Sequence, residues 1–275
     1  MNCNFIYFLL FIILPISYSC HKPSLQEEKK LLPKNIKVFD LNIFGSATTS
    51  DLKIIHAAKI MAQYLDNDED GIVDNKLVHE MLISRNATLL MFNNESEAEA
   101  AWMSGEYNFS NNSQLLFDDE TIPSFNSNAP NGRFDASLEE VLHLITHEGY
   151  SYVYPDLKEV KGSSIAKAMD EARGGYFQTP PSQYPSNAWY SYDDITCTYD
   201  CMIVEYFYWA LTSILGAQSY PGRINEIGHE WKLNTKEKVE NLDTLIFTLM
   251  TNLDFNLPKV LPDNDYKGFE IKLEN

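Results

Sequence analysis

The clearest hydrophobic pattern in the chain lies in residues 137–151, which read SLEEVLHLITHEGYS. Leu138, Val141, Leu142 and Ile145 recur at a spacing close to 3.6 residues and therefore share one face of a helix. The pattern predicts an amphipathic α-helix that buries this face.

The candidate metal-ligating side chains lie on the opposite face of the same helix. Ser137 with Glu140 three residues later predicts a capping box at the helix start. Glu140, His143 and His147 line one stripe, and imidazoles at i and i+4 can hold a transition metal through two nitrogens. The alternative is a solvated face with two ordinary histidines, and the sequence leaves both interpretations open.

The rest of the chain contains short apolar runs, which are typical of strands, and stretches with the 3.6-residue repeat of a helix. Short apolar runs at 87–92 and 114–117 predict buried strands. Amphipathic or capped patterns predict helices at 51–65, 76–85, 95–102, 163–173 and 235–252. The chain is therefore predicted to be α+β and mostly helical, with a small β-sheet.

Residues 201–217 are apolar all round the helix, which predicts a central buried helix against which the other helices pack. Glu205 lies inside this run, and a buried carboxylate must be paired, hydrogen-bonded or bound to a cation. Three explanations remain open: an arginine such as Arg173 or Arg223, hydrogen bonds from nearby tyrosines, or a metal shared with the histidine pair of residues 143 and 147.

An acidic loop, DNDEDGIVDNKL at residues 66–77, separates two of the predicted helices. It resembles the calcium loop of the EF-hand family at positions 1, 3, 5, 6, 7 and 9, which are Asp66, Asp68, Asp70, Gly71, Ile72 (through its carbonyl) and Asp74. Position 12, a bidentate glutamate in the family, is Leu77 here. The resemblance implies an EF-hand-like unit over residues 50–85 that binds Ca²⁺ weakly in a structural role.

The order strand, helix, strand, loop and histidine-bearing helix loosely resembles the zincin metallopeptidases. Their signature is HExxH, whereas here His143 is followed by Leu144, and His147-Glu148 has Ser151 where the second histidine belongs. The resemblance implies a Zn²⁺ site at the histidine pair.

In that interpretation His143, His147 and Glu205 are the metal ligands, and a water completes a catalytic type of site. Glu148 or Glu140 is the candidate general base. Asp170 or Glu171 is a further candidate ligand, although Asp170 is spaced to pair with Arg173.

The N-terminus predicts export. Residues 5–18 are almost wholly apolar and too short for a comfortable membrane span, as in a signal peptide. Ser19-Cys20 resembles the processing site of bacterial lipoproteins, which implies envelope anchoring through a lipidated Cys20; the alternative is a plain cleaved signal peptide and an extracellular protein. We expect residues 1–20 to be the signal peptide, 21–35 a tether and 36–275 one globular domain.

The remaining cysteines, Cys197 and Cys201, are predicted to form a disulfide in an oxidising compartment. Between the predicted helices, residues 176–197 are rich in proline and aromatic side chains. This loop is predicted either to form the wall of a cleft for a peptide or glycan, or to cap the hydrophobic core.

The net charge of −18 limits the kinds of partner that the protein can bind. Such a field repels phosphate backbones and anionic membranes, which argues against nucleic acid and leaves a lipid on Cys20 as the only membrane contact. Two hypotheses follow: an exported metal-dependent, peptidase-like hydrolase with a structural calcium loop, or a non-catalytic, calcium-stabilised surface lipoprotein that binds a protein or glycan.

Overall fold

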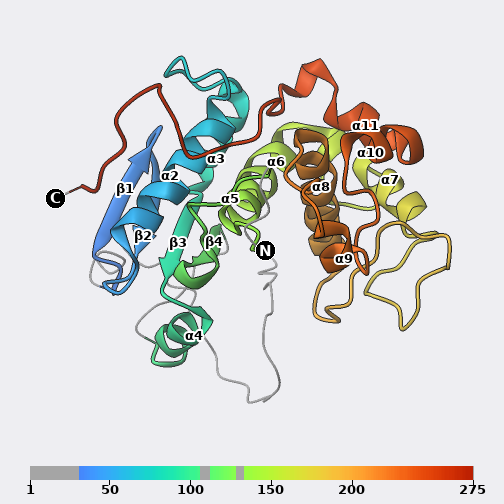
Figure 1. Cartoon of the computed structure of the whole chain (residues 1–275), viewed down its shortest axis with the longest axis horizontal. Coiled ribbons are helices and arrows are strands. Elements are labelled where there is room, and N and C mark those ends of the chain that lie inside the picture. The colour runs from blue at the N-terminus through green and yellow to red at the C-terminus, as the bar shows by residue number, and fades with distance from the viewer. Residues whose placement is uncertain (1–30, 106–111, 128–132, 275) are drawn as a thin grey trace.

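The computed structural model describes residues 31–105, 112–127 and 133–274 (Figure 1). The predicted signal peptide, Cys20 and most of the predicted tether lie outside these residues. Within the described part, no helix is long and apolar enough to cross a membrane.

Four short strands form one mixed sheet in the order β1-β2-β3-β4. β1 (Lys34–Val38) pairs antiparallel with β2 (Leu41–Gly45), and β3 (Thr88–Phe92) lies parallel to both β2 and β4 (Ser113–Phe117). The strands predicted at 87–92 and 114–117 are confirmed, whereas β1 and β2 were not predicted. β1 begins inside the range 21–35, so the last residues of that range belong to the sheet.

Both faces of the sheet are covered, which explains why β3 reads as an uninterrupted apolar run. Leu89 and Met91 point to the main core with α2 (Asp51–Leu65) and α5 (Ser137–Ile145). Leu90 and Phe92 point to a smaller core under α4 (Glu95–Met103). The alternation follows from the two-residue repeat of a strand.

The rest of the chain is mostly helical, which confirms the predicted α+β class. It comprises α3 (Lys76–Arg85), α6 (Ser151–Val153), α7 (Ser164–Ala172), α8 (Tyr199–Leu215), α9 (Arg223–Ile227), α10 (Lys236–Leu242) and α11 (Thr244–Met250). Short 3₁₀ turns η1 (Asp118–Glu120), η3 (Pro155–Leu157) and η4 (Leu253–Phe255) connect them. α5 contacts edge strand β4 on one side and α8 on the other, so it lies between the sheet and helices α7–α11 (Figure 1).

The start of α5 differs from the prediction. Ala136 is the residue before the helix, and no side chain caps it, so the capping box of Ser137 and Glu140 does not form. Instead the carboxylate of Asp135 accepts hydrogen bonds from the Ser137 hydroxyl (2.6 Å) and backbone amide (3.3 Å). The Glu140 side chain therefore takes no part in capping the helix.

The predicted helix 235–252 is broken in two at Asp243. The Asp243 carboxylate accepts hydrogen bonds from the amide of Ile246, the indole of Trp189 (2.7 Å) and the hydroxyl of Tyr206 (2.6 Å). A side chain that caps a new helix start ends the preceding helix. Leu242, the last residue of the first of the two helices, is 61% exposed.

Candidate metal centre

Acidic side chains from two helices surround a buried imidazole. The ligand atoms of Glu139, Glu140 and His143 on α5 all lie within 4.8 Å of one another. His143 Nδ1 is 3.6 Å from Glu140 Oε2, and His143 Nε2 is 3.7 Å from Glu205 Oε2 on α8. The predicted approach of Glu205 to His143 is therefore present, and Glu139 is an additional member that the sequence did not identify. We call these four residues the α5–α8 cluster.

One nitrogen of the cluster makes no hydrogen bond to a described residue. The His143 side chain is only 6% exposed, and its Nε2 makes no hydrogen bond to any described residue. Buried polar atoms in native proteins are nearly always satisfied, so such an atom calls for an explanation. A cation bound at Nε2 is one, because imidazole nitrogens are ordinary transition-metal ligands.

Of the three carboxylates, Glu140 accepts a hydrogen bond from a neutral donor, Gln114 Nε2 on β4, at 2.5 Å. Tyr208 and Tyr192 lie near Glu139 and Glu205, respectively, and each lowers the pKa of its neighbouring carboxyl. Among the described residues no lysine or arginine forms an ion pair with any of the three. The cluster thus gathers three acids around one imidazole, and such proximity is costly unless a proton or a cation compensates it.

The protonation equilibria reflect this crowding. Burial, followed by the charges of Glu205 and Glu140, raises the pKa of Glu139 to about 8. Burial lowers the pKa of His143, but Glu205, Glu140 and Glu139 outweigh it and raise the value to about 10. Burial also raises the pKa of Glu205. The metal-free cluster therefore retains protons that the same groups would release in water.

Of the three explanations for Glu205, the arginine pairing is wrong. Arg173 pairs with Asp170 at 2.6 Å, as its spacing predicted, and Arg223 pairs with Glu226 at 3.0 Å. Asp170 and Glu171 are not among the groups of described residues whose side chains could share a metal. Tyr192 lies near Glu205 and lowers the pKa of its carboxyl, which is compatible with both remaining explanations.

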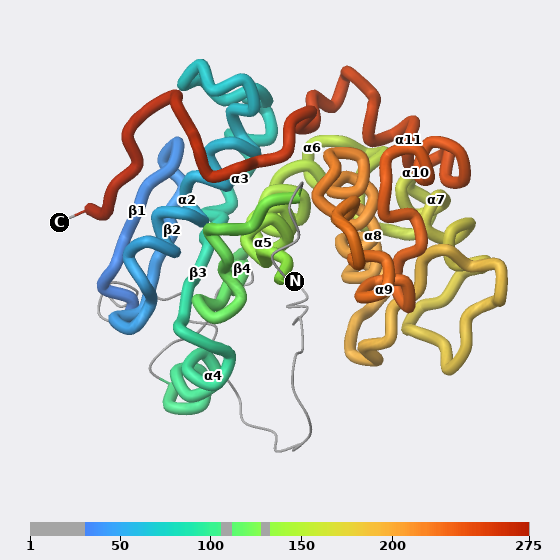
Figure 2. Tube along the Cα trace, viewed as in Figure 1, coloured from blue at the N-terminus to red at the C-terminus, as the bar shows by residue number. Residues whose placement is uncertain are grey.

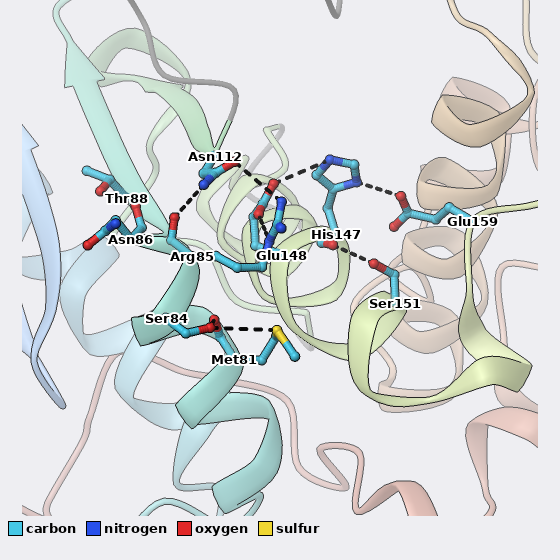
Figure 3. A network of polar contacts seen from close by, with 10 residues as sticks. All are labelled: Met81, Ser84, Arg85, Asn86, Thr88, Asn112, His147, Glu148, Ser151 and Glu159. Carbon is cyan, nitrogen blue, oxygen red and sulfur yellow. Dashed lines mark hydrogen bonds and ion pairs between the residues drawn. The ribbon is translucent and has the colours of Figure 1, made fainter. Parts of the chain in front are cut away.

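His147 does not join the cluster. Its Nδ1 is bonded to Glu159 Oε2 at 2.6 Å, and its Nε2 lies 3.5 Å from Glu148 Oε1 (Figure 3). No group of three metal-ligating side chains that includes His147 lies within 4.8 Å in the described part of the chain. The predicted pairing of the two imidazoles on one metal is therefore not what the structure shows.

The backbone gives the reason. At Thr146 the helix changes to the π form, η2 (Thr146–Tyr150), before continuing as α6. Two side chains at i and i+4 point the same way only if the helix between them is a regular α-helix. The wider π turn changes the rotation per residue, so His147 points away from His143. The wider turn brings Gly149 so close to α3 that an added Cβ would lie 2.7 Å from Val78 Cγ1.

Glu148, one of the two candidate bases, belongs to the same separate network. Its side chain is 2% exposed, and its Oε2 accepts a hydrogen bond from Arg85 Nε (Figure 3). Arg85 Nη2 donates to Asn112 Oδ1 at 3.4 Å. Glu140, the other candidate, lies in the α5–α8 cluster. The structure therefore places the two candidate bases in different networks, whereas the sequence gave no reason to prefer one of them.

The predicted calcium loop forms a second acidic group. Helices α2 and α3 flank it, and ligand atoms of Asp66, Asp68 and Asp70 lie within 4.8 Å of one another. Gly71 has φ = +86°, the conformation that position 6 requires. Ile72 and Asp74 follow at positions 7 and 9; Asp74 Oδ2 accepts the amide of Asn67 at 2.7 Å. Leu77 at position 12 is 60% exposed and carries no ligand atom.

The C-terminal segment is tied to this loop, which the sequence did not predict. Tyr266 donates to Asp66 Oδ2 at 2.6 Å, and the amide of Lys267 donates to Glu69 at 3.0 Å. Asn67 Oδ1 accepts the amides of Lys259 and Val260. Figure 2 shows this segment running from α11 past α3 towards β1. The acidic loop of residues 66–77 is therefore also where the C-terminal segment is attached.

The aromatic loop between α7 and α8 is not helical, as predicted, and Trp189, Tyr190 and Tyr192 pack against the main core. Tyr190 is fully buried, and Tyr192 lies near Glu205. The predicted disulfide joins Cys197 to Cys201, with Cα atoms 5.4 Å apart, at the start of α8. These contacts support the interpretation that the loop caps the core, and they place one of its tyrosines at the α5–α8 cluster.

A third group lies nearby on the surface. Asp193, His229 and Glu230 have ligand atoms within 4.8 Å of one another, and both Asp193 and His229 are exposed. Burial, together with the negative charges of Glu205 and Asp193, raises the pKa of Glu230 to about 7. This group therefore adds negative charge close to Glu205.

Comparison with models of protein families, with curated protein sequences and with solved structures gives no match for this chain.

Proposed function

We propose that the chain is a metal-dependent hydrolase whose divalent cation is held by the α5–α8 cluster, with peptide bonds as its substrate. The observation that carries the proposal is the buried Nε2 of His143, which makes no hydrogen bond to a described residue and lies 3.7 Å from Glu205 Oε2, in a ring whose ligand atoms also approach Glu139 and Glu140. One imidazole with carboxylates is a ligand set that suits zinc and related divalent metals. We also propose that α8 organises the other helices, because it packs against α5, α7, α10 and α11.

The residues divide into roles. His143 Nε2 and Glu205 Oε2, which lie 3.7 Å apart, are the proposed ligands. Glu139, which shares a group of ligand atoms with His143 and Glu140, is the proposed third. A divalent cation there would polarise the substrate carbonyl. Glu140 is the base that accepts a proton from the attacking water, because Glu148 is engaged by Arg85. Gln114 holds Glu140 in place.

A peptide library tests the activity. Metal-loaded protein is incubated with a mixture of peptides, and new termini are identified by mass spectrometry. We expect cleavage that a chelator abolishes and that the variants Glu140→Gln and His143→Ala lose, while Glu148→Gln retains it. Cleavage that persists in the first two variants, or that no metal supports, would contradict the proposal.

We further propose that Ca²⁺ binds the 66–77 loop and stabilises the fold. Extracellular calcium sites of this kind have dissociation constants of roughly 0.1–1 mM. Free Ca²⁺ at about 100 times that constant stabilises a protein by about 2.7 kcal/mol. Because the loop also holds Tyr266 and Lys267, the C-terminal segment should become more resistant to proteolysis as Ca²⁺ binds.

Thermal unfolding measures this effect. We expect Ca²⁺ to raise the melting temperature of the wild type by about 5 °C or more, given the usual slope for domains of this size. Asp68→Asn should lose most of the increase, whereas Asp254→Asn, an exposed acid outside the loop, should keep it. Equal responses in both variants would assign the stabilisation to unspecific screening.

Export and lipidation of Cys20, and a peptide or glycan partner, remain predictions from the sequence. The Cys197–Cys201 disulfide supports an oxidising compartment.

A further inference from the structure

Two asparagines of the described residues begin Asn-X-Ser/Thr triplets. The first triplet is Asn-Ala-Thr at residues 86–88, between α3 and β3, and the second is Asn-Glu-Ser at residues 94–96, between β3 and α4. A triplet of this kind, without proline in the middle, is the acceptor for N-linked oligosaccharides in exported proteins. Because such triplets also arise by coincidence, the surroundings of each side chain decide whether it can carry a glycan.

The Asn86 side chain is accessible. Asn86 ends α3 with a left-handed backbone (φ = +53°) and is exposed. Its backbone N–H donates to Leu82 and Ile83, and its carbonyl accepts from the Thr88 hydroxyl, but its side-chain amide makes no hydrogen bond to a described residue. Figure 3 shows this side chain directed away from the Arg85 side of the polar network. A glycan on Asn86 Nδ2 would therefore displace no contact of the described residues.

Asn94 uses only one of its two side-chain polar atoms. Its Oδ1 caps α4 by accepting a hydrogen bond from the amide of Glu97 at 3.0 Å. Its Nδ2 donates no hydrogen bond to a described residue. An N-linked glycan is attached to Nδ2, and the amide oxygen keeps its lone pairs. The helix cap is therefore compatible with glycosylation of the same side chain.

The two positions also suit bulky groups. α4, which Asn94 precedes, covers the face of the sheet opposite to α5 (Figure 1). A glycan there would leave the α5–α8 cluster uncovered. Asn86 and Asn94 lie beyond opposite ends of β3. Because a strand rises by about 3.3 Å per residue, they are up to roughly 26 Å apart, which leaves room for a glycan on each.

We infer that Asn86 and Asn94 are N-glycosylation sites, an inference that rests on the proposed export of the chain. The sugar donor is a lipid-linked oligosaccharyl diphosphate. In the transfer a bond forms between the asparagine Nδ2 and C1 of the first sugar, and the bond between C1 and the diphosphate oxygen breaks. Nδ2 gives up one proton, and the lipid diphosphate leaves. No oxidant or reductant is needed.

Site-by-site mapping of glycans tests the inference. The full chain, with its signal peptide, is expressed in a eukaryotic secretory cell and collected from the medium. An amidase that removes N-glycans in heavy-oxygen water converts each glycosylated asparagine into a labelled aspartate, which peptide mass spectrometry locates. We expect the label at Asn86 and Asn94. The same triplet begins at Asn108 and Asn111, which lie outside the described residues, so the position of the label and not the total mass is the readout.

Three variants sharpen the test. Ser96→Ala keeps Asn94 and its helix cap but removes the hydroxyl that completes the triplet, so it should lose the label at Asn94 and keep it at Asn86. Asn86→Gln should lose only the label of its own site. Asn93→Gln is the matched control, because Asn93 is exposed and adjacent to Asn94 but begins no triplet. It should retain both labels.

The outcomes separate this inference from export itself. A secreted chain without the label at Asn86 or at Asn94 would overturn the inference for that asparagine and leave export standing. A label at Asn94 that survives Ser96→Ala would also overturn it, since the triplet would then not be the acceptor. A chain that stays inside the cell with its signal peptide uncleaved would overturn both the inference and the proposed export.

Discussion

Replacing His143 with alanine is expected to reduce the affinity for Zn²⁺ by about 100-fold or more, because it removes the only nitrogen ligand of the α5–α8 cluster. The remaining carboxylates would retain weak, less selective cation binding. Metal content after purification and the dissociation constant for Zn²⁺ measure the effect.

The matched control for this prediction is His147→Ala. This histidine lies one turn further along the helix but is engaged by Glu159 and Glu148. We expect its substitution to leave Zn²⁺ binding unchanged. It should instead lower stability modestly, because both carboxylates lose a partner. If His147→Ala removed the metal as completely as His143→Ala, the two imidazoles would share a site and the assignment made from the structure would be wrong.

Replacing Glu205 with glutamine is expected to change stability in opposite directions with and without metal. In the metal-free protein at pH 8 the substitution removes a buried carboxyl whose ionisation the fold disfavours, because burial raises its pKa, and this should stabilise the fold by about 1–3 kcal/mol. In excess Zn²⁺ the variant lacks a ligand, so it should be less stable than the wild type. Chemical denaturation in both conditions measures the two differences.

The pH dependence has a definite sign. The pKa of Glu139, raised to about 8, means that the folded state keeps a proton that the unfolded chain releases above about pH 4.5. The elevated pKa of His143 acts in the same direction above about pH 6.5. Metal-free wild type should therefore lose stability as pH rises from 5 to 9. The advantage of Glu205→Gln should be small at pH 5; an advantage independent of pH would show that charge crowding is not its cause.

Much of the fold could be predicted from the spacing of apolar residues along the chain. The helix at 137–145, both helices around the acidic loop and the strands at 88–92 and 113–117 follow from local spacing of apolar residues. The loop with its glycine at position 6 was predicted because the turn demands a positive φ, and Gly71 has it.

The parts that were missed have two different causes. β1 and β2 form a hairpin that turns at Phe39 and Asp40, both at positive φ, where the sequence lacks the glycine or asparagine that usually signals such a turn. Asp243 breaks a helix because Tyr206 and Trp189 reach it from distant segments. Such contacts leave no trace in the local sequence.

Only part of the candidate site could be predicted, because local spacing does not show how the backbone turns or which residues meet. His143 and Glu205 were identified, because an imidazole on a helix face and an acid in an apolar helix each require a partner. His147 was misplaced because a π turn cannot be recognised from i, i+4 spacing. Glu139 was overlooked, although two adjacent glutamates one turn before a histidine were a usable signal.

A crystal structure of the Zn²⁺-loaded protein, with anomalous diffraction recorded on both sides of the zinc absorption edge, tests the central claim most directly. The account predicts one strong peak about 2.0–2.2 Å from His143 Nε2 and from carboxylate oxygens of Glu205 and Glu139. A peak at His147, or bound zinc with His143 Nε2 free of it, would contradict the assignment.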